Sequence, residues 1–497
     1  MEKPMYEKLF IGGDLSGIQK FLYNISSKKA AVSLKGRSAY LLDFMRDVYD
    51  KLKKQLQGAV EDIYCSGGKF YLQAADTEDN RLAIECMARE KASELWKEHR
   101  GALGLSIRYV PFTENADGTL YVEGENHIKV GILWKTISEL FYRDKQQRLN
   151  YRGKQQRLKN HLVGNYHDFF EPIELEGSPK VCIVTGIESA DCVLYDFGDE
   201  KRYVLPSVWE QIKKGKELSK SEDIKDFETY AKGTYLGILR MDVDGLGRRF
   251  GERGFDSISE YKRFSDRLTN FFENELEAIQ QKEYKYKEHV CLIYAGGDDV
   301  FAVGRWDKVI DFAKRIHDEV KTRFAEDGLS ISGGMVIVKP KYPIAKAAEK
   351  AGEAEEAAKH FRNGEKNAFS LFGRTVSWNG EFDVVKKYKD MFQNLVKSDG
   401  LDRSLLHKVM LYASIAEKNE QRKQEGKPLD YSYYWHASYY LARFAKRNEK
   451  NEKVKDLCDE LRTRVMTDVR KLQLVALGAR WAELWLRMEN KKEDNNQ

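Results

Sequence analysis

Apolar residues recur along the chain with two periods, and each period predicts a different kind of element. Short apolar runs that end in glycine predict strands followed by tight turns, and four of them lie near residues 9–21, 62–74, 236–250 and 290–304. From about residue 386 the apolar residues recur at three- and four-residue intervals, as in amphipathic helices. The pattern therefore predicts an α+β part followed by a helical part.

The helical part is predicted to contain helices at residues 405–415, 431–446, 454–472 and 474–488. Several aromatic residues occur in these helices. Large aromatic side chains at helical spacing are more often packed inside a bundle than used as stacking platforms for nucleic-acid bases. We therefore interpret five of them as core residues, namely Tyr433, Tyr434, Trp435, Trp481 and Trp485.

Two adjacent acids mark the stretch around which the α+β part is organised. Residues 290–304 predict a β-hairpin with Gly296 and Gly297 at its bend, and Asp298 and Asp299 follow directly. Neighbouring carboxylates repel each other unless a cation or a proton relieves the repulsion. The acidic pair therefore predicts a site for a hard cation.

A second group of acids lies upstream, where an apolar strand ends in Asp242 and Asp244 and the chain turns at Gly245. If this strand lies beside the hairpin, Asp242, Asp298 and Asp299 supply three carboxylates to one point. Oxygen ligands without a nearby His or Cys fit Mg²⁺ or Mn²⁺ rather than zinc. Such sites bind triphosphates and activate a hydroxyl for attack on phosphorus. The alternative interpretation is an acidic surface turn beside an unrelated helix cap.

The same arrangement occurs earlier in a weakened form, which indicates an internal duplication. Residues 9–21 can be laid over residues 239–250, which matches Asp14 with Asp242, Ser16 with Asp244 and Gly17 with Gly245. Residues 62–74 then fall on the hairpin. Asp14 precedes Gly67 by 53 positions (67 − 14). Asp242 precedes Gly296 by 54 positions (296 − 242), so the separations agree.

This alignment predicts what the first copy has lost. Gly67 and Gly68 match the glycine pair of the second copy, and Lys69 and Phe70 then stand where the second copy has its two adjacent acids. A lysine and a phenylalanine cannot ligate a divalent cation. The second copy is therefore predicted to keep the metal site, and the first copy to keep only the glycines.

Taken together, five stretches resemble the large subunit of type III-A (Csm) CRISPR effector complexes: residues 13–21, 34–38, 66–68, 242–244 and 296–299. That family has two ferredoxin-like Palm domains and makes cyclic oligoadenylates from ATP when its complex engages target RNA. The resemblance covers nearly the whole chain. The chain departs from the family in lacking both paired CxxC zinc ligands and, before the first Palm motif, the HD nuclease domain that commonly begins the family's sequences.

The resemblance implies an α+β fold with two ferredoxin-like Palm domains, a small linker domain and a C-terminal helical bundle. The expected boundaries are 1–165 for the degenerate first Palm domain, 166–228 for the linker domain, 229–385 for the second Palm domain and 386–497 for the helical domain. Two His-Asp doublets, at residues 167–168 and 317–318, lack the further His and Asp that an HD phosphohydrolase needs. We therefore expect no HD nuclease activity.

The resemblance also implies roles for individual residues. The metal-binding and catalytic residues of the second Palm domain are expected to be Asp242, Asp298 and Asp299. The nucleotide-binding residues are expected to be Ser16, Gly17, Gly67 and Gly68 in the first Palm domain, with Gly296 and Gly297 in the second. Lys359 is similar to the triphosphate-binding lysine of Palm-type cyclases, although an exposed helical lysine explains it equally well.

The expected substrate is ATP, with Mg²⁺ or Mn²⁺ and without zinc. The expected partners are a small subunit on the helical domain, a subunit that binds the end of the guide RNA, and the guide and target RNAs themselves. Two alternatives stay open. The chain could be mainly a scaffold of the RNA-guided complex, or it could be a nucleotidyl cyclase that makes another signal from GTP or from ATP plus a second small molecule.

Composition adds limits to these expectations. Of the 497 residues 42% are hydrophobic, which is enough for several cores, and the formal net charge of +5 permits contact with RNA. Six scattered cysteines indicate a reducing compartment rather than a disulfide framework. The first ten residues lack the apolar region of an export signal, and no apolar stretch is long enough to span a bilayer. We therefore expect a cytoplasmic protein without a membrane partner.

Overall fold

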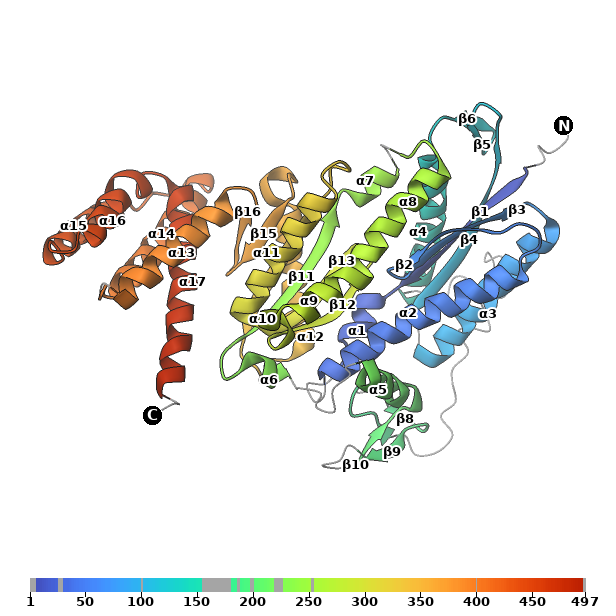
Figure 1. Cartoon of the computed structure of the whole chain (residues 1–497), viewed down its shortest axis with the longest axis horizontal. Coiled ribbons are helices and arrows are strands. Elements are labelled where there is room, and N and C mark those ends of the chain that lie inside the picture. The colour runs from blue at the N-terminus through green and yellow to red at the C-terminus, as the bar shows by residue number, and fades with distance from the viewer. Residues whose placement is uncertain are drawn as a thin grey trace. The chain divides into compact units, whose positions relative to one another are not determined.

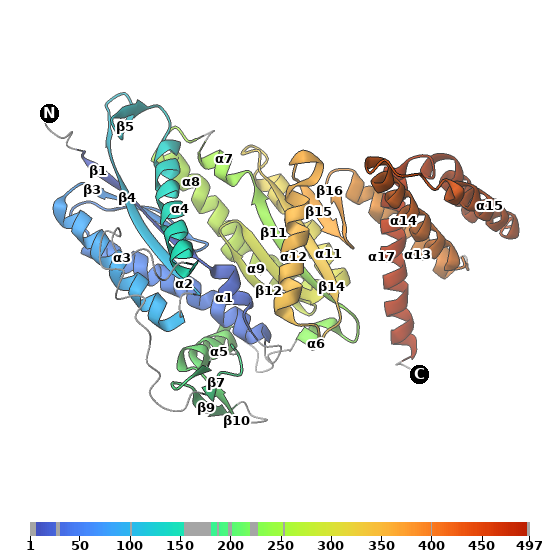
Figure 2. The ribbon, with the colours of Figure 1, turned by 180° about the vertical axis from the view of Figure 1, so that it is seen from behind.

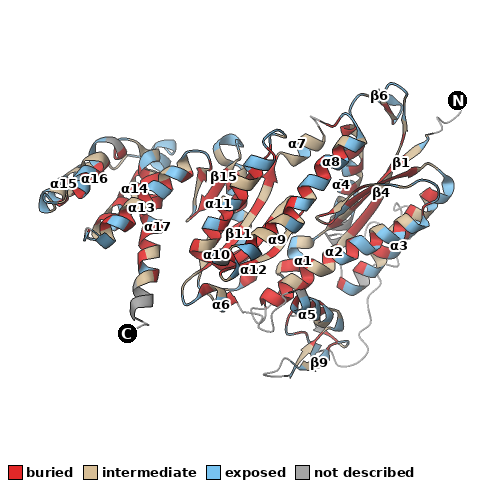
Figure 3. Cartoon of the chain, viewed as in Figure 1, coloured by how far each residue is buried: buried red, intermediate tan, exposed pale blue. Residues whose placement is uncertain are grey.

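The computed structural model describes residues 6–25, 30–99, 102–153, 180–185, 188–196, 201–218, 227–251, 254–398 and 400–494. The chain divides into two compact units: Met1–Ser330 with Val338–Lys350, and Ile331–Ile337 with Ala351–Gln497. Buried positions follow the strands and the inner faces of the helices in each unit (Figure 3). Among the helices in the described ranges, none is both long and apolar enough to cross a membrane.

The first half of the first unit is a sheet with the strand order β2-β3-β1-β4-β5-β6. Its strands are β1 (Lys8–Ser16), β2 (Glu61–Ser66), β3 (Lys69–Ala75), β4 (Gly104–Glu114), β5 (Leu120–Val122) and β6 (Glu125–His127). Its helices are α1 (Ile18–Tyr23), α2 (Ala30–Gln55), α3 (Glu78–His99) and α4 (Gly131–Gly153). Helices α2 and α3 lie on one side of the sheet and α4 on the other (Figures 1 and 2). Because both faces are covered, the apolar residues 9–11 of β1 are fully buried.

The second half of the first unit repeats this core, since the order β12-β13-β11 matches β2-β3-β1. Its elements are α6 (Phe227–Ala231), β11 (Leu236–Asp244), α7 (Leu246–Phe250), α8 (Ile258–Thr269), a π-helical turn (Asn270–Glu275), α9 (Leu276–Lys282), α10 (Tyr284–Lys287), β12 (Val290–Gly296), β13 (Asp299–Arg305) and α11 (Trp306–Arg323). Helix α8 begins where the Ser257 hydroxyl accepts the N–H of Glu260 at 3.1 Å. The shared strand order confirms the predicted duplication.

Short strands and one helix lie between the two halves in the sequence: β7 (Lys180–Val181), β8 (Glu188–Ser189), β9 (Val193–Asp196), β10 (Lys201–Val204) and α5 (Pro206–Leu218). Cys182 and Cys192 are buried here and pack as small apolar residues. Helix α5 packs closely on α2, because a Cβ atom at Gly36 would lie 1.7 Å from the carbonyl oxygen of Gln211. Only glycine permits that approach.

The second unit holds the helical part of the chain. The remaining elements are β14 (Ser330–Val338), α12 (Ile344–Lys359), a 3₁₀ turn (Phe361–Asn363), β15 (Ala368–Leu371), β16 (Arg374–Ser377), α13 (Glu381–Ser398), α14 (Ser404–Gln424), α15 (Ser432–Arg447), α16 (Glu452–Glu460), a π-helical turn (Leu461–Val465) and α17 (Val469–Asp494). Strand β14 pairs in parallel with β15, which pairs antiparallel with β16. Helix α17 packs against α13 and α14.

The boundaries predicted for the last helices are wrong in one region. The predicted helix over residues 454–472 is α16 followed by the π-helical turn Leu461–Val465, and it ends there. Helix α17 begins at Val469 and runs past residue 474 without a break. The carboxylate of Asp468 accepts the backbone N–H of Lys471 at 3.0 Å and so caps the start of α17. Apolar residues on both sides of this start belong to one core, so periodicity gave no sign of it.

The five aromatic residues interpreted as core do not all lie there. Tyr433 and Trp481 are buried, and Tyr434 and Trp485 pack against the core to which Tyr433 belongs. Trp435 is 76% exposed on α15, so that prediction is wrong for this residue. Trp435 directly follows Tyr433 and Tyr434, which face the core. Successive residues point in different directions around a helix, so the next side chain already faces solvent.

Candidate active site

Asp242 and Asp299 lie directly opposite each other on β11 and β13. Each offers a carboxylate oxygen, these oxygens lie within 4.8 Å of one another, and both side chains are half-buried. Two such charges repel by roughly 1 kcal/mol in water and by several times that near a protein surface. A divalent cation bound to both oxygens removes the repulsion. The pair therefore fits Mg²⁺ or Mn²⁺. As the sequence predicted, the strand that ends near Asp242 lies beside the hairpin that carries Asp299.

Asp298 lies in the turn between β12 and β13, next to that pair in sequence. Its carbonyl oxygen accepts the backbone N–H of Val243 at 3.1 Å, which fixes the turn against β11. Its side chain lines a cavity that α4 of the first half also borders. The adjacent acids therefore have different neighbours: Asp299 lies opposite Asp242, and Asp298 borders the cavity.

The register of the first half corrects the sequence alignment. Asp14 on β1 lies opposite Lys69 on β3, as Asp242 lies opposite Asp299. Lys69 is therefore the counterpart of Asp299. The predicted alignment, which set Phe70 against Asp299, is wrong by one residue.

The two turns show why the alignment slipped. Both turns have two residues, 67–68 in the first half and 297–298 in the second. The carbonyl of Gly68 accepts the N–H of Leu15 on β1 at 2.8 Å, just as the carbonyl of Asp298 accepts the N–H of Val243 on β11. Gly68 is thus the counterpart of Asp298. The sequence alignment matched Gly67 and Gly68 with Gly296 and Gly297. In the structure only Gly67 and Gly297 are equivalent turn glycines, so the alignment hid the change from Gly68 to Asp298.

Equivalent glycines follow the strands that carry the acidic positions, as predicted. Gly17 precedes α1 and Gly245 precedes α7, and both have left-handed backbone conformations with φ of 88° and 74°. A Cβ atom at Gly17 would also lie 2.2 Å from the carbonyl oxygen of Ala102. The hydroxyl of Ser16 donates to the carbonyl of Gly104 at 3.0 Å. These contacts hold the start of α1 against β4.

The tips of the two hairpins meet. A Cβ atom at Gly67 would lie 2.9 Å from the Cα atom of Gly297. Both residues have positive φ, at 58° and 67°, which favours glycine at each. The N–H of Gly297 donates to the hydroxyl of Ser66 at 3.2 Å. The turns of the two duplicated hairpins are therefore in direct contact within the first unit.

Glu273 supports this junction, and sequence reasoning missed it. The hydroxyl of Ser66 donates to the carboxylate of Glu273, which lies in the π-helical turn of the second half. Arg46 on α2 forms an ion pair with the same carboxylate at 3.1 Å. A glutamate in a helix without a motif carries no sign that it will contact a serine 207 positions away.

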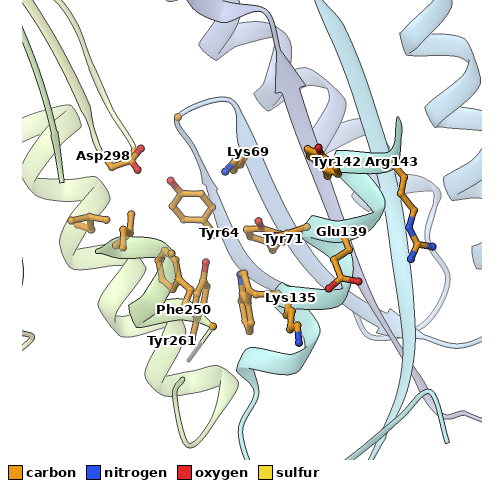
Figure 4. Close-up of a pocket in the computed structure, with 18 residues that line it drawn as sticks. Tyr64, Lys69, Tyr71, Lys135, Glu139, Tyr142, Arg143, Phe250, Tyr261 and Asp298 are labelled. Atoms are coloured by element: carbon orange, nitrogen blue, oxygen red, sulfur yellow. The ribbon is translucent and has the colours of Figure 1, made fainter. Parts of the chain in front are cut away.

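A cavity of about 900 Å³ lies beside the hairpin tips, between the two halves (Figure 4). Its aromatic lining residues are Tyr64, Tyr71, Trp134, Tyr142, Phe250 and Tyr261, and its charged ones are Lys69, Lys135, Glu139, Arg143 and Asp298. The rings of Trp134 and Tyr261 lie 3.8 Å apart between centroids and join α4 to α8. Pockets for small molecules have volumes in this range.

Two tyrosines near the acids remain protonated. Burial is the main cause that holds the pKa of both Tyr64 and Tyr294 well above the ordinary value for tyrosine. The next cause is the neighbouring Tyr261 for Tyr64 and the carboxylate of Asp299 for Tyr294. The hydroxyl of Tyr294 donates to the carbonyl of Gly296 at 3.1 Å. Both side chains are therefore neutral hydrogen-bond donors beside the hairpin tips.

Lys359 lies in the last turn of α12, in the second unit. Its amine is 2.7 Å from a carboxylate oxygen of Glu355, and only 21% of its side chain is exposed. The lysine is therefore not the solvated helical lysine of the alternative interpretation. Its contact with a triphosphate stays a prediction.

Two family models match the chain. One, described as "Csm1 subunit domain B", matches residues 7–162, and the other, described as "Cas10/Cmr2, second palm domain", matches residues 235–370. A relative from Methanocaldococcus jannaschii is named "CRISPR system single-strand-specific deoxyribonuclease Cas10/Csm1 (subtype III-A)". It is 26% identical over 507 residues, which cover 80% of this chain and 62% of the relative. The chain therefore spans less than two thirds of that relative's length.

Solved structures share the fold. A Csm1-Csm4 cassette in complex with cA4 has a TM-score of 0.64 and 20% identity, covering 96% of this chain and 70% of that chain. A Csm1-Csm4 cassette in complex with one ATP has a TM-score of 0.63 and 19% identity, with the same coverage. The predicted α+β fold is confirmed. The family models, the relative and the shared fold all agree with the duplicated sheets. The chain belongs to the Cas10/Csm1 family of type III-A CRISPR proteins.

Proposed function

We propose that the chain is the large subunit of a type III-A CRISPR effector complex and converts ATP to cyclic oligoadenylates when the complex binds target RNA. The observation that carries this proposal is the pair of Asp242 and Asp299 beside a hairpin tip that meets its duplicate at Gly67. The related solved structures that contain cA4 or ATP support the choice of nucleotide.

The metal ligands in this proposal are Asp242 and Asp299, with Asp298 beside them. A bound Mg²⁺ or Mn²⁺ ion would neutralise the triphosphate and favour loss of the hydroxyl proton. In each transfer, a ribose hydroxyl oxygen bonds to the α-phosphorus of a second ATP, pyrophosphate leaves with the electron pair of the broken P–O bond, and the hydroxyl proton passes to water. Repeating the transfer within one chain of nucleotides closes the ring.

Two half-sites supply the geometry of this reaction. The second half presents one ATP through Gly296, Gly297 and the metal ligands, with Lys359 on the triphosphate. The first half holds the other ATP with Ser16, Gly17, Gly67 and Gly68. The contact between the hairpin tips fixes the distance between the two nucleotides, and fixed in-line geometry carries most of the catalysis in phosphoryl transfer.

The proposed partners follow from the family and from the neighbours. The related structures contain Csm4, so we propose a Csm4-type subunit that binds the end of the guide RNA. We further propose that the helical domain binds a small subunit, that guide and target RNA complete the complex, and that it works in the cytoplasm without a membrane.

We assign nucleotidyl transfer, not DNA cleavage, to the residues described here. His317 on α11 is buried and lies 3.1 Å from its neighbour Asp318. That burial leaves little room for a metal and a DNA strand. The other doublet, at residues 167–168, lies outside the described residues.

Mass spectrometry of reaction products tests the proposed function. The assembled complex, with guide and matching target RNA, is incubated with ATP and Mg²⁺. We expect oligoadenylates from the wild type and from Asp117→Asn, which changes an exposed turn. We expect a loss of at least about a hundredfold from Asp242→Asn with Asp299→Asn. Unchanged output from that double variant overturns the assignment, and absence of metal-dependent ATP binding favours a scaffold.

A further inference from the structure

Lys69 stands where the second half has a metal-binding carboxylate. The strand register makes it the counterpart of Asp299, and its partner Asp14 is the counterpart of Asp242. The duplicated site thus has two carboxylates in one half and a carboxylate with an ammonium group in the other. An ammonium group repels a divalent cation. At this position the first half therefore has the positive charge of the lysine in place of a bound metal ion.

The ammonium group of Lys69 is accessible to a ligand. Its side chain is 54% exposed, and its Nζ atom lies 4.0 Å from the nearest carboxylate oxygen of Asp14. At that distance the two groups form an ion pair but not a hydrogen bond. Asp14 therefore orients the lysine, and donors of the ammonium group remain for an anion.

The cavity beside Lys69 has the chemistry of a nucleotide site. Its aromatic side chains offer faces on which a base can stack, and Lys69, Lys135 and Arg143 bring positive charge. Figure 4 shows Lys69 at the end of the cavity where Asp298 enters from the other half. A phosphate group at this end would contact the lysine while lying close to the hairpin tips.

We propose that Lys69 is a tethered cation that binds the phosphate groups of a nucleotide in this cavity, in the place that a divalent ion has in the other half. The choice of nucleotide rests on the proposed function, because ATP is the substrate proposed there. A fixed ammonium group neutralises phosphate without recruiting a second metal ion. This explains how the first half can lack the two acids of the hairpin and still hold a substrate.

Nucleotide binding without metal tests this role. Binding of ATP to the purified full chain is measured in excess EDTA, so that the carboxylate pair of the second half has no metal to offer. We expect Lys69→Gln to weaken binding by at least about tenfold and Lys69→Arg to stay within about threefold. Lys51→Gln, on a half-exposed lysine of α2 that pairs with Asp47, is the matched control and is expected to change nothing.

Equal ATP affinity of the wild type and Lys69→Gln overturns the proposal. A second measurement uses Mn²⁺: Lys69→Asp restores the carboxylate pair with Asp14, so we expect it to bind one more Mn²⁺ ion per chain than the wild type. No gain overturns the claim that the lysine occupies a metal position. Neither measurement involves RNA or turnover, so both outcomes are independent of whether the complex makes oligoadenylates.

Discussion

The Cα atom of Gly297 lies 2.9 Å from the point that a Cβ atom on Gly67 would occupy. These glycines belong to the turns of the two duplicated hairpins, 230 positions apart in the sequence (297 − 67). The contact lies beside the cavity that residues of both halves line. A Cβ atom at Gly67 would force the neighbouring backbone to shift, so this contact can be tested by substitution.

Gly67→Ala is expected to weaken both stability and activity. Alanine in the left-handed conformation costs about 1–2 kcal/mol, and the new methyl group would also meet the backbone of Gly297. We expect a loss of about 2–3 kcal/mol in denaturant unfolding. Gly118→Ala is the control, because its φ is also positive but nothing lies within 4 Å. If both variants lowered the free energy of unfolding equally, the contact between the hairpins would not contribute to stability.

Ser66→Ala is expected to loosen the junction without unfolding the chain. It removes the acceptor of the Gly297 N–H and the donor to Glu273. A buried N–H left without its partner costs about 1–3 kcal/mol. We expect a lower rate of nucleotide transfer with less change in the affinity for ATP, measured by product formation over a range of ATP concentrations. Wild-type kinetics would exclude a role for Ser66 in positioning the turn.

The sequence predicted the duplication, the hairpins and three carboxylates at one point, of which the structure pairs Asp242 with Asp299, because glycine and aspartate have strong local preferences at turns and strand ends. It could not fix the register at Lys69, since a glycine had been replaced by Asp298 within the turn and only the backbone hydrogen bonds reveal the match. The role of Glu273 was equally hidden. Its partners Ser66 and Arg46 come from the other half, and such long-range contacts have no local pattern.

In the helical part, periodicity identified the helices but not all of their faces. Trp435 follows two inward-facing tyrosines and is nevertheless exposed. The start of α17 depends on the cap at Asp468, which is a single hydrogen bond rather than a periodic feature. Boundaries and single faces depend on such local contacts, whereas the existence of a bundle depends on the sum of many apolar positions.

Two tryptophans of this part are expected to respond differently to replacement. Trp481 is 4% exposed, and its ring lies 5.9 Å from that of Phe382, so Trp481→Ala should lower the unfolding free energy by about 3–5 kcal/mol. Trp435 is 76% exposed, so Trp435→Ala should stay within about 0.5 kcal/mol. Denaturant unfolding of both variants checks this. A large loss from Trp435→Ala would contradict the orientation of α15.

Stability is expected to fall in mild acid because of His99. Burial, and then the positive charge of Arg37, lowers the pKa of His99 from 6.5 to about 4. Between these values the unfolded chain binds a proton that the folded chain excludes, so the unfolding free energy decreases as the pH falls from about 6.5 to 4. The contribution is about 3 kcal/mol at most. Denaturant unfolding at pH 7 and pH 5 should show a smaller difference for His99→Gln than for the wild type, and an equal difference would contradict it.

Binding of Mn²⁺ tests the central claim most directly, because it needs neither RNA nor turnover. The full chain is titrated with Mn²⁺ in the presence of a non-hydrolysable ATP analogue, and free Mn²⁺ is followed by electron paramagnetic resonance. We predict that Asp242→Asn and Asp299→Asn each weaken binding by at least about tenfold, or about 1.4 kcal/mol, and that Asp117→Asn does not. Wild-type affinity in both site variants would contradict the account.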